Sequence, residues 1–141
     1  HPNSRRQRQM CIRDRYAAVK LSELAIGIGP FVVGPAVQRK VGLSAMSTLA
    51  IDATSWYSAE WAKEKGLYAS IYDTTEEMDE AVQKLCCKLA LSHESAILEL
   101  KKIFWKGTEN WDNLLTERAK ISGELILSSY SKDAIKKIKG K

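Results

Sequence analysis

Long hydrophobic runs are absent from this sequence of 141 residues, although 45% of its residues are hydrophobic. The most apolar stretch, residues 25–33, is interrupted by Gly27, Gly29 and Pro30. A membrane-spanning helix needs roughly 20 consecutive apolar residues, so we expect no membrane partner. The hydrophobic share and the 28% of charged residues are both typical of a globular domain that buries a core.

Cysteine is scarce, with only Cys11, Cys86 and Cys87 present. The adjacent Cys86 and Cys87 cannot pair easily, and no Cys-x-x-Cys motif or Cys/His cluster with the spacing of metal ligands occurs. These absences predict no metal site, and they favour a reducing, cytoplasmic location. We expect Cys86 and Cys87 to lie on a helix, with at least one of them facing the core.

Glycine motifs that cradle nucleotide phosphates are also missing. Gly27, Gly29 and Gly34 share one loop, but the third glycine comes two residues too late for the dinucleotide pattern Gly-x-Gly-x-x-Gly. Pro30 removes a backbone donor from the same loop, and no Gly-Lys-Ser/Thr of a P-loop follows. The sequence therefore predicts neither of these nucleotide-binding loops.

The net charge of +5 is concentrated at the two ends of the sequence. Residues 1–15 hold five arginines against one aspartate, and residues 132–141 hold five lysines against one aspartate. The segment between them has a small excess of acidic residues. Because a nucleic-acid-binding domain concentrates positive charge on one face or groove, we expect no nucleic acid partner.

Residues 1–15 differ from the rest of the sequence. They are polar and Arg-rich, they show neither helical nor strand periodicity, and they lack the apolar region of a secretory signal. A basic arm or a targeting peptide is one interpretation of this segment. We favour the other, a disordered or artefactual segment that does not belong to the domain.

Short strands and helices alternate after this segment. In order, we expect a strand over residues 16–21, a glycine-rich loop over 24–34, helices over 35–41, 43–52 and 59–65, and a strand over 67–72. Gly42 is expected to close the first helix. Ser58 is placed to cap the third helix, and Gly66 to end it.

The remaining sequence is predicted to be helical. Thr74 and Glu77 form the Thr-x-x-Glu pattern of a capping box, and Ser92 and Ser131 are expected to cap later helices. Apolar residues at helical spacing predict that each helix turns one face to the core; they are Met78, Ala81, Val82, Leu85, Leu89, Ile97, Leu100, Phe104, Trp111, Leu114, Leu115, Ile121 and Leu125. The fold class predicted from this order is α/β with a helical C-terminal region.

Glu23 is the strongest candidate for a catalytic residue. It lies between a strand-like run and the apolar glycine loop. Burial disfavours the charged form of a carboxyl group, so a glutamate beside apolar surface can exchange protons with a carbon acid near neutral pH. The alternative is a solvated glutamate at a strand end. His93 has no partner pattern for catalysis, and we expect it at a solvated helix start.

The run KLSELAIGIGPFVVGPAVQRKVG, residues 20–42, resembles the enoyl-CoA hydratase/isomerase (crotonase) family. In that family a glutamate follows a strand, and a glycine loop and a helix with an arginine and a Val-Gly come next. The matching residues are Glu23, Gly27, Pro30, Gly34, Arg39, Val41 and Gly42. The segment over residues 62–68, with its Ala-x-x-x-Gly-Leu pattern, continues the resemblance, which is closest to bacterial enoyl-CoA hydratase/isomerase-like proteins, with methylglutaconyl-CoA hydratase as one example of the type.

This resemblance implies a C-terminal half of a crotonase-type (ClpP/crotonase) spiral fold. It divides the sequence into residues 1–15 outside the family, residues 16–72 of the core, and a helical oligomerisation region over 73–141. It implies that Glu23 is the catalytic acid/base. It further implies that substrate contacts come from the glycine loop: Gly27, Ile28, Gly29, Pro30 and Phe31.

The same resemblance implies an acyl-CoA substrate, with coenzyme A as part of the substrate and no separate cofactor or metal. Family subunits form trimers or hexamers, so a homo-oligomer is expected. Pro30 is followed by Phe31 where the family has Pro-Gly, and the loop is longer than usual. This difference changes the expected shape of the acyl pocket.

The half of the family fold that precedes this region supplies the CoA-binding strand, the oxyanion hole and, in hydratases, a second glutamate. The expected activity of the whole enzyme is that of a lyase in fatty acid metabolism, an enoyl-CoA hydratase, and this chain alone is expected to be inactive. Two alternatives remain: a Δ3-Δ2 isomerase or CoA-ester hydrolase of the same superfamily, and a non-enzymatic helical interaction protein.

Overall fold

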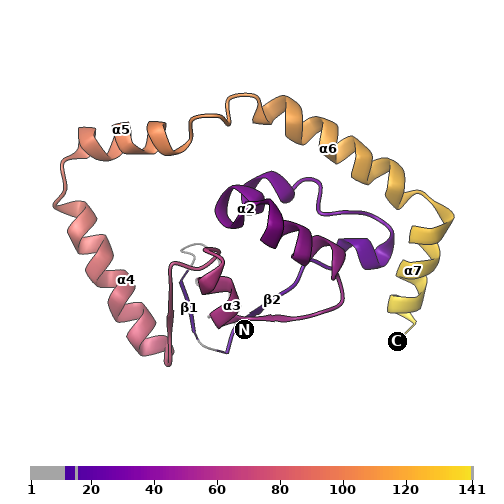
Figure 1. The fold of residues 1–141 in the computed structure, drawn as a ribbon, viewed down its shortest axis with the longest axis horizontal. Helices are drawn as coiled ribbons and strands as arrows, with labels where there is room; N and C mark the ends of the chain where they lie inside the picture. The colour runs from indigo at the N-terminus through magenta and orange to yellow at the C-terminus, as the bar shows by residue number, and fades with distance from the viewer. Residues whose placement is uncertain (1–11, 15, 141) are drawn as a thin grey trace.

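The computed structural model describes residues 12–14 and 16–140. Short strands and two helices come first, and four consecutive helices follow (Figure 1). The elements are β1 Ile12–Asp14, β2 Ala18–Val19, η1 Glu23–Ile26, α2 Gly34–Ile51, β3 Tyr57–Ser58, α3 Ala59–Glu64, β4 Ser70–Tyr72, α4 Thr75–Ala90, α5 Glu94–Phe104, α6 Trp111–Ile126 and α7 Ser129–Lys139. This order confirms an α/β fold with a helical C-terminal region.

The strands form two small sheets. β1 pairs with β4 in parallel, with Ile12 opposite Ser70 and Asp14 opposite Tyr72. β2 pairs with β3 antiparallel, with Ala18 opposite Ser58. The sequence predicted neither β1 nor β3, because strands of two or three residues are too short to show alternation and their partners lie far away in the sequence. The other residues of the segment 1–15 lie outside the described residues.

A small core lies where α3 packs on the strands. Ala59, Ala62 and Tyr68 are buried together, and partly buried hydrophobic residues surround them, namely Val19, Trp61, Leu67 and Ile71. The two alanines let the short helix approach the strands closely. We call residues 12–14 and 16–72, which contain this core, the body.

The helix α2 belongs to the body and breaks at Gly42, as the sequence predicted. Gly42 has φ 80° and ψ 168°, so two helical segments meet at this residue. An L-residue rarely adopts such a positive φ, which explains the glycine. Beyond the break, Ala45, Met46 and Leu49 are buried, and Leu49 is only 2% exposed.

Helix starts confirm two of the expected caps and correct two others. The side chains of Ser58 and Thr74 accept hydrogen bonds from the backbone N–H groups of Trp61 and Glu77, as predicted. The predicted caps Ser92 and Ser131 are wrong. The residue next to Ser92, His93, caps α5 through Nδ1, and Ser128 caps α7 with its hydroxyl. In both cases a serine close to the actual cap could also cap the helix, and sequence propensity alone does not tell which of the two residues does so.

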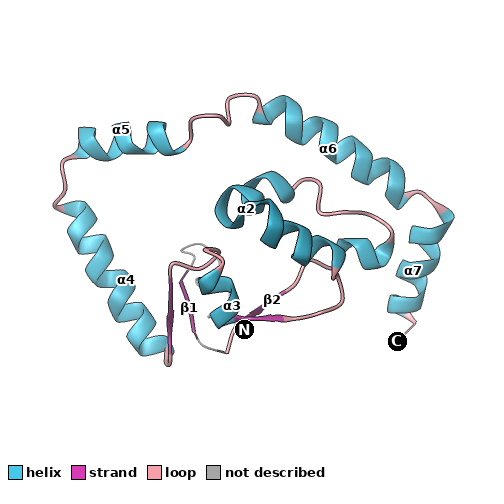
Figure 2. Cartoon of the chain, in the orientation of Figure 1, coloured by secondary structure: helices cyan, strands magenta, loops and turns pink. Residues whose placement is uncertain are grey.

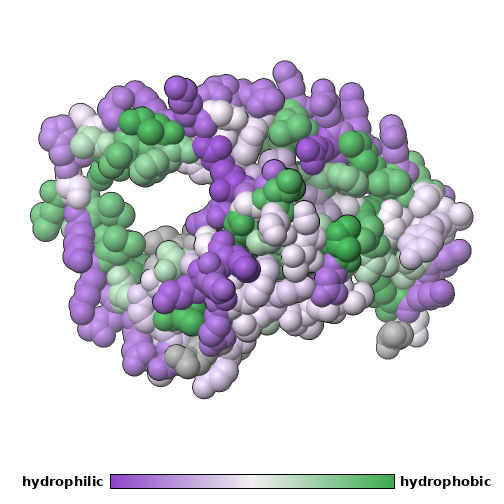
Figure 3. Space-filling view, viewed as in Figure 1, coloured by the Kyte–Doolittle hydropathy of each residue, from purple (hydrophilic) through white to green (hydrophobic). Residues whose placement is uncertain are grey.

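The helices α4–α7, residues 75–139, form an arc around the body, and we call this arc the arm (Figures 1 and 2). The arm meets the body where α4 packs on β1 and β4 and where α7 packs on η1. Between these contacts a space-filling view shows an opening with hydrophobic residues along its upper and left rim and hydrophilic residues on its right (Figure 3).

Much of the apolar surface of α4 and α5 is exposed, contrary to the predicted inward orientation, whereas Trp111, Leu114 and Leu115 of α6 are half-buried. Met78 is buried, but Leu85, Leu89, Leu100 and Phe104 are exposed, Phe104 by 65%. Cys86 and Cys87 are both exposed, so the prediction that one of them faces the core is wrong. Helical periodicity predicts that an apolar helix face packs against another surface, but it does not predict whether the same chain supplies that surface. No helix in the described part of the chain has the length and hydrophobicity that a membrane span requires.

Candidate active site

Glu23 lies in a tight turn rather than at a strand end. It is the first residue of the 3-10 helix η1, which ends when the backbone N–H of Gly27 donates to the carbonyls of Glu23 and Leu24. The side chain is half-buried, and among the described residues its Oε2 atom is buried without a hydrogen-bond partner. One oxygen of Glu23 is therefore shielded from solvent, while the side chain as a whole stays partly exposed.

Helix α7 covers the turn that holds Glu23. Gly27 has φ 82°, and a Cβ atom at this position would lie 2.6 Å from both Oγ of Ser131 and Cδ1 of Tyr130. Glycine is thus required twice, by its backbone conformation and by the close approach of α7. Ser131 is fully buried, and its Oγ also has no partner within the described residues. The sequence missed this contact because Ser131 was assigned to a helix cap.

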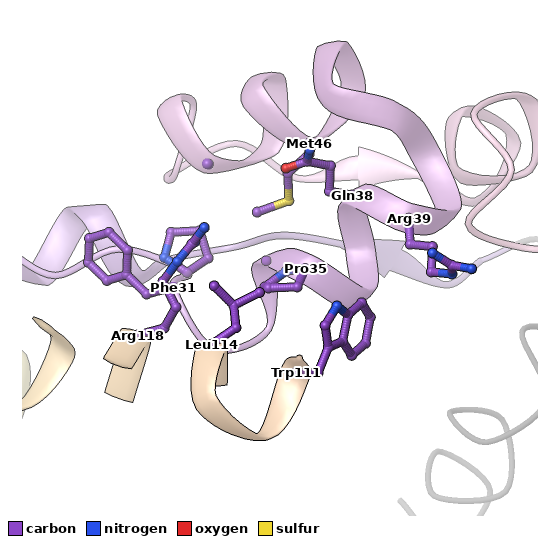
Figure 4. A pocket seen from close by; sticks show the side chains of 11 residues that line it. Phe31, Pro35, Gln38, Arg39, Met46, Trp111, Leu114 and Arg118 are labelled. Carbon is purple, nitrogen blue, oxygen red and sulfur yellow. The ribbon is translucent and has the colours of Figure 1, made fainter. Parts of the chain in front are cut away.

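The glycine loop borders a cavity of about 500 Å³ between the loop, α2 and α6 (Figure 4). Its lining residues are Pro30, Phe31, Gly34, Pro35, Gln38, Arg39, Met46, Ala50, Trp111, Leu114 and Arg118. Two of the predicted substrate-binding residues, Pro30 and Phe31, are among them. The lining mixes polar side chains, namely Gln38, Arg39 and Arg118, with apolar ones, and the cavity is open to solvent.

The other predicted loop residues and Glu23 do not line this cavity. Gly27 faces α7, and Gly29 is buried below the ring of Phe31, where a Cβ atom would lie 2.8 Å from the ring. Ile28 donates its backbone N–H to the carbonyl of Glu23 at 3.2 Å. The loop therefore has two parts: its first half supports the turn of Glu23, and its second half shapes the cavity.

Arg39 fastens the arm to the body. Its guanidinium donates hydrogen bonds to the carbonyl of Phe104 and, at 2.9 Å, to that of Lys106, and it lies 5.8 Å from the ring centre of Trp105. The resemblance matched this arginine without predicting its partners. In the same loop, hydrogen bonds from the backbone N–H groups of Glu109 and Gly107 lower the pKa of the Glu109 carboxyl group.

A second polar cluster joins the end of α2 to β3. The Asp52 carboxylate accepts hydrogen bonds from the Tyr57 hydroxyl at 2.7 Å and from the Ser55 hydroxyl at 2.8 Å. These bonds, that from Tyr57 first, lower the pKa of Asp52, and the bond to Asp52 raises the pKa of Tyr57. The cluster is exposed and fixes a turn. No sequence motif predicted it.

No protein-family model matches this sequence, and no curated protein matches it. Solved structures do match. An enoyl-CoA hydratase from Mycobacterium avium subsp. paratuberculosis K-10 aligns with a TM-score of 0.81 and 20% identity, covering 92% of this chain and 53% of that chain. An enoyl-CoA hydratase from Bacillus halodurans aligns with a TM-score of 0.79 and 21% identity, covering 89% of this chain and 50% of that chain.

An enoyl-CoA hydratase/isomerase from Pseudoalteromonas atlantica T6c gives a similar result, with a TM-score of 0.77, 16% identity, and coverage of 88% of this chain and 50% of that chain. The chain thus spans about half the length of the solved structures it matches. At these identities the likeness shows the fold. The chain has a crotonase-type fold, as the resemblance implied.

Proposed function

We propose that this chain is part of an acyl-CoA-processing enzyme of the crotonase family, an enoyl-CoA hydratase in which Glu23 is the catalytic acid/base. The observation that carries the proposal is the position of Glu23. Its carboxyl group is half-buried, with one oxygen unpartnered among the described residues, at the start of a loop that borders a cavity. The crotonase-type fold supports the same interpretation.

In this proposal water adds across the double bond of a 2-enoyl-CoA. The oxygen of water bonds to the β-carbon, a proton goes to the α-carbon, and Glu23 transfers that proton. Oε2 of Glu23 has no hydrogen-bond partner among the described residues, so no bond there competes with a proton for this oxygen. Pro30 and Phe31 bound the acyl group, while Gly27, Ile28 and Gly29 hold the turn of Glu23 in place. Coenzyme A is part of the substrate, and no other cofactor takes part.

Catalysis also requires stabilisation of the thioester enolate by backbone N–H donors, which commonly contributes a few kcal/mol. The resemblance assigns these donors and a second glutamate to the N-terminal half of family subunits. We therefore propose that residues 1–141 alone do not hydrate enoyl-CoA, and that the complete active site also includes that N-terminal half.

The exposed arm supports a homo-oligomer, a trimer or a hexamer in this proposal. Large side chains on α5 and in the turn after it are exposed, among them Leu100, Ile103, Phe104 and Trp105. Contiguous exposed hydrophobic side chains on a protein surface mark interaction sites. Neighbouring subunits would cover these faces.

The test is a Glu23→Gln variant of the full-length protein, assayed by crotonyl-CoA hydration. We expect a loss of rate of about 10²-fold or more, because general acid–base catalysis contributes about 10²–10⁴-fold. Glu64→Gln, at an exposed glutamate of α3, is the matched control and should keep the wild-type rate. An unchanged rate for Glu23→Gln would remove Glu23 from the mechanism.

The same protein separates the alternatives. An isomerase converts a 3-enoyl-CoA faster than it hydrates a 2-enoyl-CoA, and a hydrolase releases free coenzyme A thiol. A non-enzymatic interaction protein has no activity on any of these substrates and does not bind acyl-CoA.

A further inference from the structure

Two buried side-chain atoms have no hydrogen-bond partner within the described residues, Oε2 of Glu23 and Oγ of Ser131. Buried polar groups in proteins are nearly always hydrogen-bonded, and leaving one unpaired costs free energy. The two atoms belong to η1 and α7, and these two elements pack on each other. Unpaired groups on the two sides of one contact are best explained together.

The hydroxyl of Ser131 differs from other hydroxyls on the helices. Ser47, Thr48 and Thr116 each donate to the carbonyl four residues earlier in their own helix. Ser131 is the third residue of α7, so no carbonyl of its own helix lies one turn before it. The residue is fully buried, and its Oγ would lie 2.6 Å from a Cβ atom at Gly27. The hydroxyl is therefore directed at the turn that Gly27 closes.

On the other side of the contact, the main chain of Glu23 is fixed. Its carbonyl accepts hydrogen bonds from the backbone N–H groups of Gly27 and Ile28. A carboxylate that transfers a proton must also keep one orientation, because a misplacement of about 1 Å can cost about 10²-fold in rate. The first turn of α7 has no acidic side chain, so its partial positive charge favours a carboxylate nearby.

We propose that Ser131 is a positioning residue for Glu23, and that one buried water molecule connects the Ser131 hydroxyl to Oε2 of Glu23. A hydroxyl both donates and accepts, and a carboxylate oxygen accepts, so a water molecule between them satisfies both atoms. Buried water commonly bridges polar groups that do not bond directly. The bridge holds the carboxylate in the orientation that proton transfer requires. The inference rests on the proposed function, to which it adds the residue that orients the acid/base.

The first experiment is a double-mutant cycle on the melting temperature of the full-length protein, which does not depend on activity. Ser131→Ala should lower the melting temperature by about 3 °C, because the buried carboxylate loses part of its hydrogen bonding. In the Glu23→Ala background the same substitution should leave the melting temperature unchanged or raise it, because the hydroxyl there has no partner to lose. Equal shifts in the two backgrounds would overturn the proposal.

The second experiment measures crotonyl-CoA hydration by the same protein. Ser131→Ala should lower kcat about tenfold and leave KM unchanged, because a carboxylate that loses its orientation impairs proton transfer rather than substrate binding. Ser131→Cys nearly keeps the size of the side chain but has only a weak donor, so its kcat should fall as well. A wild-type kcat in either variant would overturn the positioning role.

Ser129→Ala is the matched control, because Ser129 is an exposed serine of the same helix. It should keep the wild-type melting temperature, kcat and KM. The two proposals also fail separately. Coupling between Ser131 and Glu23 in the thermal cycle, without hydration of any enoyl-CoA, would refute the proposed function alone. Hydration that depends on Glu23, with additive effects in the thermal cycle, would refute the role of Ser131 alone.

Discussion

The body and the arm have similar apolar side chains but differ in what covers them. In the body, α3 and the strands bury Ala59, Ala62 and Tyr68 against one another. In the arm, α4 and α5 leave Leu89 and Phe104 exposed. The body thus buries a small core of its own, although it too exposes large apolar side chains such as Trp56, whereas α5 of the arm buries none of its residues. Local sequence pattern predicts that a face is apolar, and only the packing shows whether the chain covers it.

The sharpest test of this comparison uses α4, because this one helix has both a buried and an exposed apolar residue. On α4, which packs on β1 and β4, Met78 is 3% exposed, while Leu85 is 41% exposed. Met78→Ala should lower the free energy of unfolding by about 2–4 kcal/mol, because it removes buried methylenes and leaves a cavity. Leu85→Ala should change it by about 0.5 kcal/mol or less.

Urea unfolding followed by circular dichroism measures both variants. Sedimentation of the full-length protein then measures whether Leu85→Ala changes its oligomeric state. Equal losses of stability for Met78→Ala and Leu85→Ala in the monomer would contradict the distinction between body and arm.

The second test breaks the contact at which the arm returns to the body. Gly27→Ala places a Cβ atom 2.6 Å from Ser131 and in a left-handed conformation, at φ 82°. We expect a loss of about 1–3 kcal/mol in unfolding free energy, the usual cost of such a strained residue. Thermal unfolding measures it.

Gly123→Ala is the matched control for this substitution. Gly123 lies inside α6 and faces open space, since a Cβ atom at this position would have nothing within 4 Å. Alanine should stabilise that helix by about 0.5–1 kcal/mol. If both variants shift the melting temperature in the same direction, the close approach of α7 to Gly27 is wrong.

The third test loosens the middle of the arm. Arg39→Gln removes hydrogen bonds to the carbonyls of Phe104 and Lys106. The expected loss in global stability is about 1 kcal/mol, a typical net contribution of a hydrogen bond. Amide hydrogen exchange should accelerate between α5 and α6, and Lys40→Gln, an exposed neighbour, should leave that exchange unchanged. Equal exchange rates between α5 and α6 in Arg39→Gln and Lys40→Gln would show that Arg39 does not fasten the arm.

The smallest expected effect concerns pH and lies in the body. The pKa of Asp52 is lowered from its ordinary value of 3.8 by the hydrogen bonds from Tyr57 and Ser55. Its contribution to stability is therefore complete above that value and is lost as the pH falls through the folded pKa. Tyr57→Phe should flatten the melting temperature against pH between about 2 and 5, whereas Tyr72→Phe should not. Identical curves for the two variants would contradict this assignment.

Sequence patterns predicted the local parts of this fold well. The break at Gly42, the caps Ser58 and Thr74, and the position of Glu23 beside a glycine loop all follow from short-range chemistry. The catalytic role of Glu23 stays a prediction. Parts that depend on distant residues were missed, such as the pairing of β1 with β4.

The same reason explains what sequence reasoning missed at the candidate site. No sequence pattern singled out Arg118, which lines the cavity together with Phe31 because α6 runs beside the glycine loop. Ser131 had the composition of a cap, yet it is buried over Gly27. Neither assignment follows from a window of neighbouring residues, since both depend on how the arm curves back.

The contact between Gly27 and Ser131 also sets an order of events during synthesis. Glu23 leaves the ribosome long before α7 does, and domains fold from the N-terminus as they emerge. The turn that carries Glu23 therefore remains uncovered until residues 129–139 have been made and have returned to it. A polypeptide that ends within α5 or α6 therefore lacks the helix that packs on the turn of Glu23.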